Sequence, residues 1–255
     1  MVIRCGSQAE KKVLLKLKCL PPHDVTGSLL KNVFPEGKGK EFLIDIMNCS
    51  KKIFDAAGLP TQKANMVWLW GQGEKPKMPS FSSLFGLNGA AISAVDIVKG
   101  TARAIGFDVV NVPGATGYFD TNYEGKARAA LKALKKRDFV FVHVEAPDEA
   151  GHIGDLKEKI RAIENIDRRL LKIILKGLDK VKKFRIMVLA DHPTPVMLKK
   201  HTSDAVPFLI YDSENIRNRK EKVIFNERYA KKEKFFLAKG FKLMNHFLNK
   251  ERRSK

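Results

Sequence analysis

The chain has 255 residues, 44% of them hydrophobic, which is enough for one large or two modest domains with a real core. No apolar run could span a bilayer, and lysines interrupt the only apolar run near the N-terminus, which excludes a secretory signal. We therefore expect a soluble, cytoplasmic protein without a membrane partner. Three widely spaced cysteines suggest reduced thiols, not a disulfide framework or a thiolate zinc site: Cys5, Cys19 and Cys49.

The charge balance is strongly basic, with 48 Lys and Arg against 28 Asp and Glu and a formal net charge of +20. Such a charge favours anionic partners, either phosphorylated metabolites or nucleic acid. The basic residues, however, are spread along the chain in short pairs, and no basic-aromatic motif of a nucleic-acid module is present. We interpret them as a solvated surface and do not expect a nucleic-acid partner.

The first 80 residues mix Pro, Gly and Lys with short apolar runs, among which MVWLWGQ, residues 66–72, is the clearest predicted strand. The stretch GQGEKPKMPSFSS that follows has the Gly, Pro and Ser content of a loop or interdomain hinge. We expect two domains, residues 1–80 and 81–255.

Strands and helices alternate after Leu84. We expect helices over residues 96–106 and 126–136, and strands at 90–95, 107–112 and 138–144. The last of these strands has few polar residues, as expected for a strand that is covered on both faces.

A long helix should begin after Asp155, its N-cap, and end at Gly177. Its apolar residues follow helical spacing: Leu156, Ile160, Ile163, Ile166, Leu170 and Ile174. Strands at 185–190 and 207–211 and a closing helix over 229–248 complete the chain. This order predicts an α/β sandwich with a largely parallel sheet.

Polar residues gather where the predicted strands end. Asp148 and His152 follow one strand, Asp191 and His192 follow another, and His201 precedes the last. Ligands bind at the carboxyl ends of such strands, and carboxylate with imidazole suits Mn²⁺, Zn²⁺ or Fe²⁺. Taken singly, each residue would be a cap or a surface residue. Their shared placement predicts one or two divalent metal sites.

Several motifs in a fixed order resemble the C-terminal half of the cofactor-independent (2,3-bisphosphoglycerate-independent) phosphoglycerate mutases of the archaeal type, in the alkaline phosphatase superfamily. They are EAPDEAGHIGDLKEKIRAIENIDRRL, LADHPTP and HTSDAVPFLIY, and the resemblance extends upstream through MVWLWGQG and PPHDVTGS. It implies an incomplete alkaline-phosphatase-like sandwich with a mostly parallel sheet in 81–255. The remnant of an inserted α/β substrate domain would precede it in 1–80.

The same resemblance implies two divalent metals, with Mn²⁺ favoured and Mg²⁺, Co²⁺ or Zn²⁺ as alternatives. Asp148, His152 and His201 would bind one metal, and Asp191 with His192 would contribute to the other. The implied activity interconverts 2-phosphoglycerate and 3-phosphoglycerate in glycolysis and gluconeogenesis, through a serine that carries the phosphoryl group.

Substrate residues are also implied by the resemblance. His23 and Asp24 would belong to the glycerate or proton-transfer site, and Lys99 would stabilise the transferring phosphoryl group. A Gly-rich segment would contact substrate phosphate: Trp70, Gly71, Gln72 and Gly73. Without the surrounding motifs, each of these residues would be interpreted as structural or solvated.

The sequence departs from the family pattern at its N-terminus. Relatives begin with a strand that ends in an aspartate ligand, followed by the nucleophilic serine, and neither is found here. The chain would then hold only one metal fully. It is expected to be a fragment, an inactive truncated relative, or half of an enzyme whose remainder is a separate chain.

Other functions stay open at the level of sequence. One is a metal-dependent phosphatase or phosphopentomutase of the same superfamily, and another is a non-catalytic metal-binding or interaction protein. The sequence does not set the oligomeric state.

Overall fold

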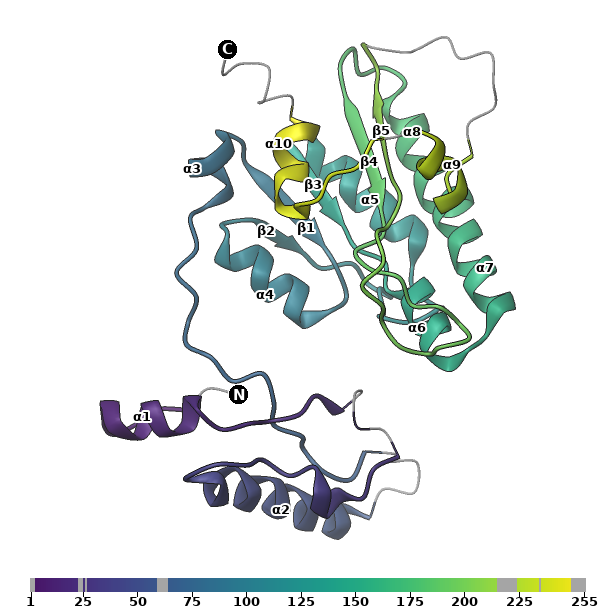
Figure 1. Cartoon of the computed structure of the whole chain (residues 1–255). Coiled ribbons are helices and arrows are strands. Elements are labelled where there is room, and N and C mark those ends of the chain that lie inside the picture. Colours follow the sequence, from purple (N-terminus) through teal and green to yellow (C-terminus); the bar gives the residue numbers. More distant parts are fainter. Residues whose placement is uncertain are drawn as a thin grey trace. The chain divides into compact units, whose positions relative to one another are not determined.

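The computed structural model describes residues 3–22, 25, 27–58, 64–214, 224–233 and 235–248. The chain divides into two compact units, Met1–Lys77 and Met78–Lys255 (Figure 1). None of the described helices is long and apolar enough to cross a membrane.

The first unit is built around two helices, α1 (Gln8–Leu15) and α2 (Lys40–Ala57), with a short 3₁₀ turn at Leu30–Asn32. Helix α1 begins at Ser7, whose hydroxyl accepts a hydrogen bond from the Glu10 amide. The described part of this unit contains no strand, only an isolated antiparallel bridge between residues 18 and 36. Its assignment to an inserted substrate domain stays a prediction.

The strand predicted at 66–72 is wrong, because the segment is held by side chains and not by a ladder. The Ser50 hydroxyl accepts a hydrogen bond from the Val67 amide at 2.9 Å, and the indole of Trp68 donates to the Leu20 carbonyl at 2.8 Å. The continuous apolar run therefore marks packing positions here, not a strand.

The second unit contains a parallel sheet of three strands in the order β2-β1-β3. These strands are β1 (Gly89–Ile92), β2 (Asp108–Val110) and β3 (Phe139–Val142). All four residues of β1 are buried, as expected for a central strand, and Ala91 lies opposite Val109 and Phe141. The predicted parallel α/β sheet is confirmed.

Helices cover both faces of this sheet. On one face α3 (Phe81–Phe85) and α4 (Asp96–Ala104) form an apolar cluster with Phe107. On the other, α5 (Tyr123–Leu134), α6 (Ala146–Ile153) and the helices after Asp155 form a second cluster around Tyr123. Strand β3 serves both clusters, because Phe139 packs against the first and Val142 against the second.

The Asp155 carboxylate caps α7 by accepting from the Glu158 amide at 2.9 Å, as predicted. The long helix consists of α7 (Leu156–Asn165), a π-helical stretch (Ile166–Leu171) and α8 (Lys172–Leu178). Gly177 lies inside α8 and does not end it. A Cβ there would lie 2.4 Å from the Leu131 side chain, so the glycine permits close packing against α5.

Only part of the apolar face of this long helix is covered. The later residues, Ile166, Leu170 and Ile174, pack into the second cluster. Three large apolar side chains of α7 stay half exposed, at 57% for Leu156, 50% for Ile160 and 52% for Ile163.

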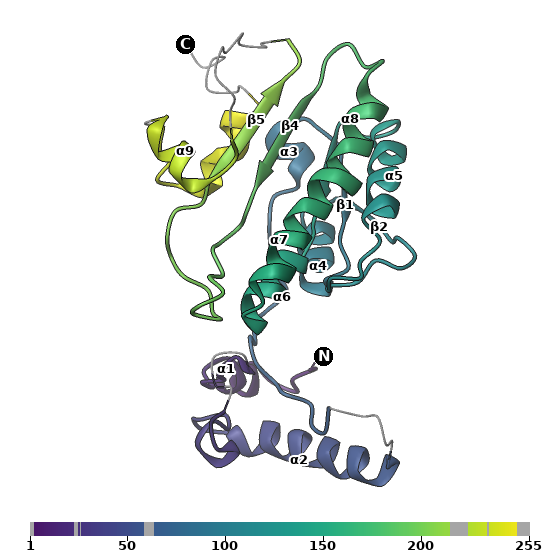
Figure 2. The same ribbon diagram turned by 90° about the vertical axis from the view of Figure 1, so that its right-hand side faces the viewer.

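The last two strands do not extend the parallel sheet. Strands β4 (Arg185–Leu189) and β5 (Phe208–Asp212) form a separate antiparallel pair (Figure 2). An ion pair of 2.6 Å between Arg185 and Asp212 joins them at one end. The single helix predicted over 229–248 is also wrong. Two short helices, α9 (Glu227–Lys232) and α10 (Leu243–Phe247), take its place.

Candidate metal centre

Four of the predicted metal ligands come from helix α6 and from the segment between β4 and β5 in the second unit. Asp148 lies in the first turn of α6, just after β3, and His152 follows one turn later on the same helix face. His192 follows the end of β4, and His201 lies in the loop before β5. The fold thus brings residues far apart in sequence to the carboxyl ends of β3 and β4.

The side chains of these residues point at one another. Asp148 Oδ1 lies 3.5 Å from His201 Nε2 and 3.9 Å from His192 Nδ1, and Asp148 Oδ2 lies 3.3 Å from His152 Nε2. The Nε2 atoms of His152 and His201 are 2.9 Å apart. One ligand atom each from Asp148, His192 and His201 falls within 4.8 Å of the others. We call Asp148, His152, His192 and His201 the histidine cluster.

Thr194 is a member of the site that sequence reasoning missed. Its hydroxyl donates a hydrogen bond to Asp148 Oδ1 and lies 3.4 Å from His192 Nδ1, and the residue is 3% exposed. The only feature of the sequence that could have identified Thr194 as a site residue is its position two residues after His192, in DHPT. A buried hydroxyl that fixes a ligating carboxylate limits the orientations that the carboxylate can take.

The loop of Thr194 is packed tightly against α6 and α7. A Cβ on Gly151 would lie 2.4 Å from the Thr194 carbonyl oxygen, so only glycine permits this approach. Lys159 of α7 donates to the same carbonyl at 2.5 Å. The carbonyl of Lys199 lies 3.1 Å from His152 Nδ1, which leaves Nε2 of that ring directed at the cluster.

A group of carboxylates adjoins the histidine cluster. Glu145, Asp148 and Glu149 have oxygens within 4.8 Å of one another. Burial raises the pKa of Glu145, and the negative charges of Asp148 and Glu149 raise it further. Neither Glu145 nor Glu149 was among the predicted ligands, and both lie beside Asp148.

Glu145 is connected to the sheet through His143. Nε2 of His143 lies 3.2 Å from Glu145 Oε2, and its Nδ1 lies 3.2 Å from the hydroxyl of Ser93, which is 3% exposed. Burial lowers the pKa of His143. The ammonium of Lys126, 1% exposed, donates to the His143 carbonyl at 3.0 Å, and burial lowers the pKa of this lysine to about 8.

The donor set of the histidine cluster fits a divalent ion. Imidazole nitrogens and carboxylate oxygens within a few ångströms of a common point suit Mn²⁺, Zn²⁺ or Fe²⁺, whereas Mg²⁺ and Ca²⁺ prefer oxygen alone. His192 lies here with Asp148 and His201, although the resemblance assigns it to a second metal. The division of ligands between two metals stays a prediction.

Of the remaining predicted site residues, Asp191 borders the histidine cluster, five lie elsewhere, and two are not described. Asp191 has a side chain 75% exposed, and its carboxylate lies 3.4 Å from His192 Nε2. Lys99 on α4 pairs with Asp96 at 3.4 Å. The first unit holds four residues assigned to substrate: Trp70, Gly71, Gln72 and Gly73. His23 and Asp24 lie outside the described residues.

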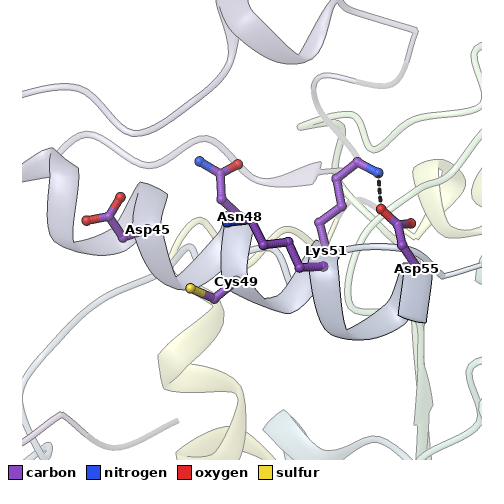
Figure 3. Close-up of a pocket in the computed structure, with 6 residues that line it drawn as sticks. Asp45, Asn48, Cys49, Lys51 and Asp55 are labelled. Carbon is purple, nitrogen blue, oxygen red and sulfur yellow. Dashed lines mark hydrogen bonds and ion pairs between the residues drawn. The ribbon is translucent and has the colours of Figure 1, made fainter. Parts of the chain in front are cut away.

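A pocket of the first unit holds none of the predicted residues. It lies along α2 and is lined by polar side chains, one pair of which, Lys51 and Asp55, is joined at 2.8 Å (Figure 3). Because Lys51 and Asp55 already pair with each other, this pocket is a weaker candidate for a metal site than the histidine cluster.

Comparison with known proteins identifies the class to which this fold and cluster belong. Residues 15–250 match the family model of the Metalloenzyme superfamily, and the chain belongs to that superfamily.

The curated relatives indicate which enzymes of this superfamily the chain resembles. A probable 2,3-bisphosphoglycerate-independent phosphoglycerate mutase of Geobacter sulfurreducens is 44% identical over 238 residues, which is 91% of this chain and 59% of the relative. The 2,3-bisphosphoglycerate-independent phosphoglycerate mutase of Methanosarcina acetivorans is 50% identical over 202 residues, 76% of this chain and 51% of the relative. The chain therefore spans little more than half the length of these relatives.

Solved structures agree at the level of the fold. A protein from Pyrococcus horikoshii matches with a TM-score of 0.64 and 31% identity, over 83% of this chain and 64% of that one. A cofactor-independent phosphoglycerate mutase from Thermoplasma acidophilum matches with a TM-score of 0.51 and 21% identity, over 85% of this chain and 54% of that one. These likenesses support the predicted phosphatase-like α/β fold.

Proposed function

We propose that the chain is the metal-binding part of a phosphoglycerate mutase that interconverts 2-phosphoglycerate and 3-phosphoglycerate without 2,3-bisphosphoglycerate. The observation that carries this proposal is the histidine cluster, because it joins ligands from two strand ends in a chain 44% identical to a probable mutase. The proposed compartment is the cytoplasm, and the proposed small-molecule partner is a phosphorylated glycerate.

Mn²⁺ is the metal we propose for the cluster. A bound divalent ion supplies Lewis-acid stabilisation of phosphoryl oxygens during in-line transfer. The chain's own contribution is to orient ligands: Thr194 fixes the Asp148 carboxylate, and the Lys199 carbonyl fixes the ring of His152. The proposed role of Lys99 is to stabilise the transferring phosphoryl group, and that of His23 and Asp24 is to form part of the glycerate or proton-transfer site.

The test is a coupled assay in which enolase consumes the 2-phosphoglycerate formed from 3-phosphoglycerate. The protein is this chain joined to the part of the Geobacter sulfurreducens relative that it does not match, with Mn²⁺ present. We expect Mn²⁺-dependent turnover that is lost in Asp148→Asn. The matched control is Asp55→Asn, an exposed carboxylate of the first unit, which should leave turnover unchanged.

Two results would contradict the proposal. Absence of turnover in the joined protein, with metal bound and the fold intact, would contradict the proposed mutase activity. Release of free phosphate without formation of 2-phosphoglycerate would identify a metal-dependent phosphatase of the same superfamily instead.

A further inference from the structure

Two sets of potential metal ligands share Asp148. One set adds His192 and His201 and is rich in nitrogen, whereas the other adds Glu145 and Glu149 and holds oxygen alone. In each set the ligand atoms lie within 4.8 Å of one another. Oxygen alone suits Mg²⁺, whereas imidazole with carboxylate suits Mn²⁺ or Zn²⁺. Whatever keeps Glu145 from joining a metal at Asp148 therefore influences which metal is preferred.

The Glu145 carboxylate lies at the start of the helix that carries Asp148. Glu145 precedes α6, and its carbonyl accepts from the Asp148 amide at 2.8 Å, so the two residues are one helical turn apart. The Glu145 side chain is 25% exposed, and Nε2 of His143 lies 3.2 Å from its Oε2. Among the described residues, this ring supplies the only donor group in contact with the carboxylate. A largely buried carboxylate that lost this partner would turn toward another positive group.

His143 is fixed independently of Glu145. Its amide donates to the Ile92 carbonyl at 2.9 Å, and its carbonyl accepts from Lys126 at 3.0 Å. Nδ1 of the ring lies 3.2 Å from the hydroxyl of Ser93, a residue that is 3% exposed and follows β1. The ring therefore stays where the ends of β1 and β3 place it, and the longer Glu145 side chain is the one that adjusts.

The contacts of the ring direct its proton toward Glu145. The Ser93 hydroxyl accepts from the Val95 amide at 3.0 Å, which leaves its own O–H available to donate to Nδ1 of His143. Burial lowers the pKa of His143, so the ring is neutral at pH 7 and carries one proton. With Nδ1 accepting, that proton is on Nε2, next to the Glu145 carboxylate.

We propose that His143 is a positioning residue that sets the metal preference of the centre, because its Nε2–H holds the Glu145 carboxylate away from a metal bound at Asp148. With Glu145 held, the centre keeps the imidazole and carboxylate donors that suit Mn²⁺. With Glu145 released, the centre gains an oxygen ligand and a negative charge, which favour Mg²⁺. The inference rests on the metal binding that the proposed function assigns to the histidine cluster.

The experiment measures how well Mg²⁺ displaces Mn²⁺ from the 255-residue chain, with the released Mn²⁺ counted by electron paramagnetic resonance. His143→Asn keeps an amide where Nδ1 contacts Ser93 but is too short to reach Glu145. The preference for Mn²⁺ over Mg²⁺ should therefore fall by at least about tenfold. His143→Gln is the matched control, because its amide N–H lies near the position of Nε2 and should keep the wild-type preference.

A second substitution separates the proposed role from general damage to the centre. Glu145→Ala alone should leave the metal preference unchanged, because Glu145 is not a ligand in the wild-type chain. His143→Asn combined with Glu145→Ala should recover the wild-type preference, since the carboxylate that would join the metal is gone. A merely structural role of His143 predicts no such recovery. His143→Leu, which fills the space beside Phe141 without any donor, repeats the shift should His143→Asn unfold.

Three results would overturn the proposal. They are an unchanged metal preference in a folded variant without the donor, a shift that persists after Glu145→Ala is added, and an equal shift in His143→Gln. Absence of Mn²⁺ uptake by the folded wild-type chain would overturn the proposed metal site as well. Uptake with an unchanged preference in the His143 variants overturns this inference alone, so the two failures are distinguishable.

Discussion

Replacing Thr194 with valine tests whether the buried hydroxyl holds the Asp148 carboxylate in position. Valine keeps the shape of the side chain but removes the hydrogen bond to Asp148 Oδ1, in a site where Thr194 is 3% exposed. A hydrogen bond to a charged group contributes about 1.5–3 kcal/mol. Since each 1.4 kcal/mol is a factor of ten in binding, we expect affinity for Mn²⁺ to fall by about 10-fold to 100-fold.

The assay is isothermal titration of the chain with Mn²⁺, with thermal unfolding measured on the same samples. Thr194→Ser is the matched control, because serine keeps the hydroxyl and should keep most of the affinity. If Thr194→Val bound Mn²⁺ as tightly as the wild-type chain, the hydroxyl would have no part in orienting the ligand, and the reasoning would be refuted.

Three other perturbations follow from contacts in the second unit. Gly151→Ala should destabilise the fold by about 1–3 kcal/mol in urea unfolding, because its Cβ would meet the Thr194 carbonyl at 2.4 Å, whereas Gly100→Ala, with nothing within 4 Å, should be neutral or stabilising. Asp155→Ala should cost about 1 kcal/mol by loss of the α7 cap, and Asp155→Asn should retain it; equal losses would contradict the cap. Burial lowers the pKa of Lys126 to about 8, whereas the ordinary pKa of a lysine is about 10.4. Between these two pH values the lysine is protonated in the unfolded chain and mostly neutral in the folded chain, so the unfolded chain binds more protons. The free energy of unfolding of the wild-type chain, relative to Lys126→Met, should therefore rise by about 2 kcal/mol between pH 8 and pH 10, and a flat or falling difference would refute the buried, proton-poor lysine.

The parallel sheet could be predicted because its signals are local. Strands such as 138–144 are short apolar runs between helices with clear caps, and Asp155 is followed by a helical period of apolar residues. The segment at 66–72 shows the limit of this reasoning. Its continuous apolar run is held by packing and side-chain hydrogen bonds, and a short apolar run alone does not distinguish that from a strand in a ladder.

Strand partners were not predictable in the same way. Pairing of β4 with β5 depends on contacts between residues distant in sequence, such as the ion pair of Arg185 with Asp212, and it gave an antiparallel pair where a parallel extension was expected. Exposure of Leu156, Ile160 and Ile163 was also unexpected, because helical spacing indicates an apolar face but not whether a neighbour covers it.

The candidate site was accessible from sequence where strand ends concentrate charged residues. Asp148, His192 and His201 follow or precede strands, so their convergence follows from the fold class. Thr194 carries no such signal, since a threonine in a loop is common and only its burial against Asp148 reveals its role.

The central claim is that the histidine cluster binds a divalent metal, and Mn²⁺ uptake measured by electron paramagnetic resonance tests it most directly. Bound Mn²⁺ loses the sharp signal of the hydrated ion, so free metal can be counted as chain is added. We predict stoichiometric uptake by the wild-type chain and by Asp55→Asn, and its loss in Asp148→Asn and His201→Ala. Uptake that persists in both cluster variants, or is absent from the folded wild-type chain, would contradict the account.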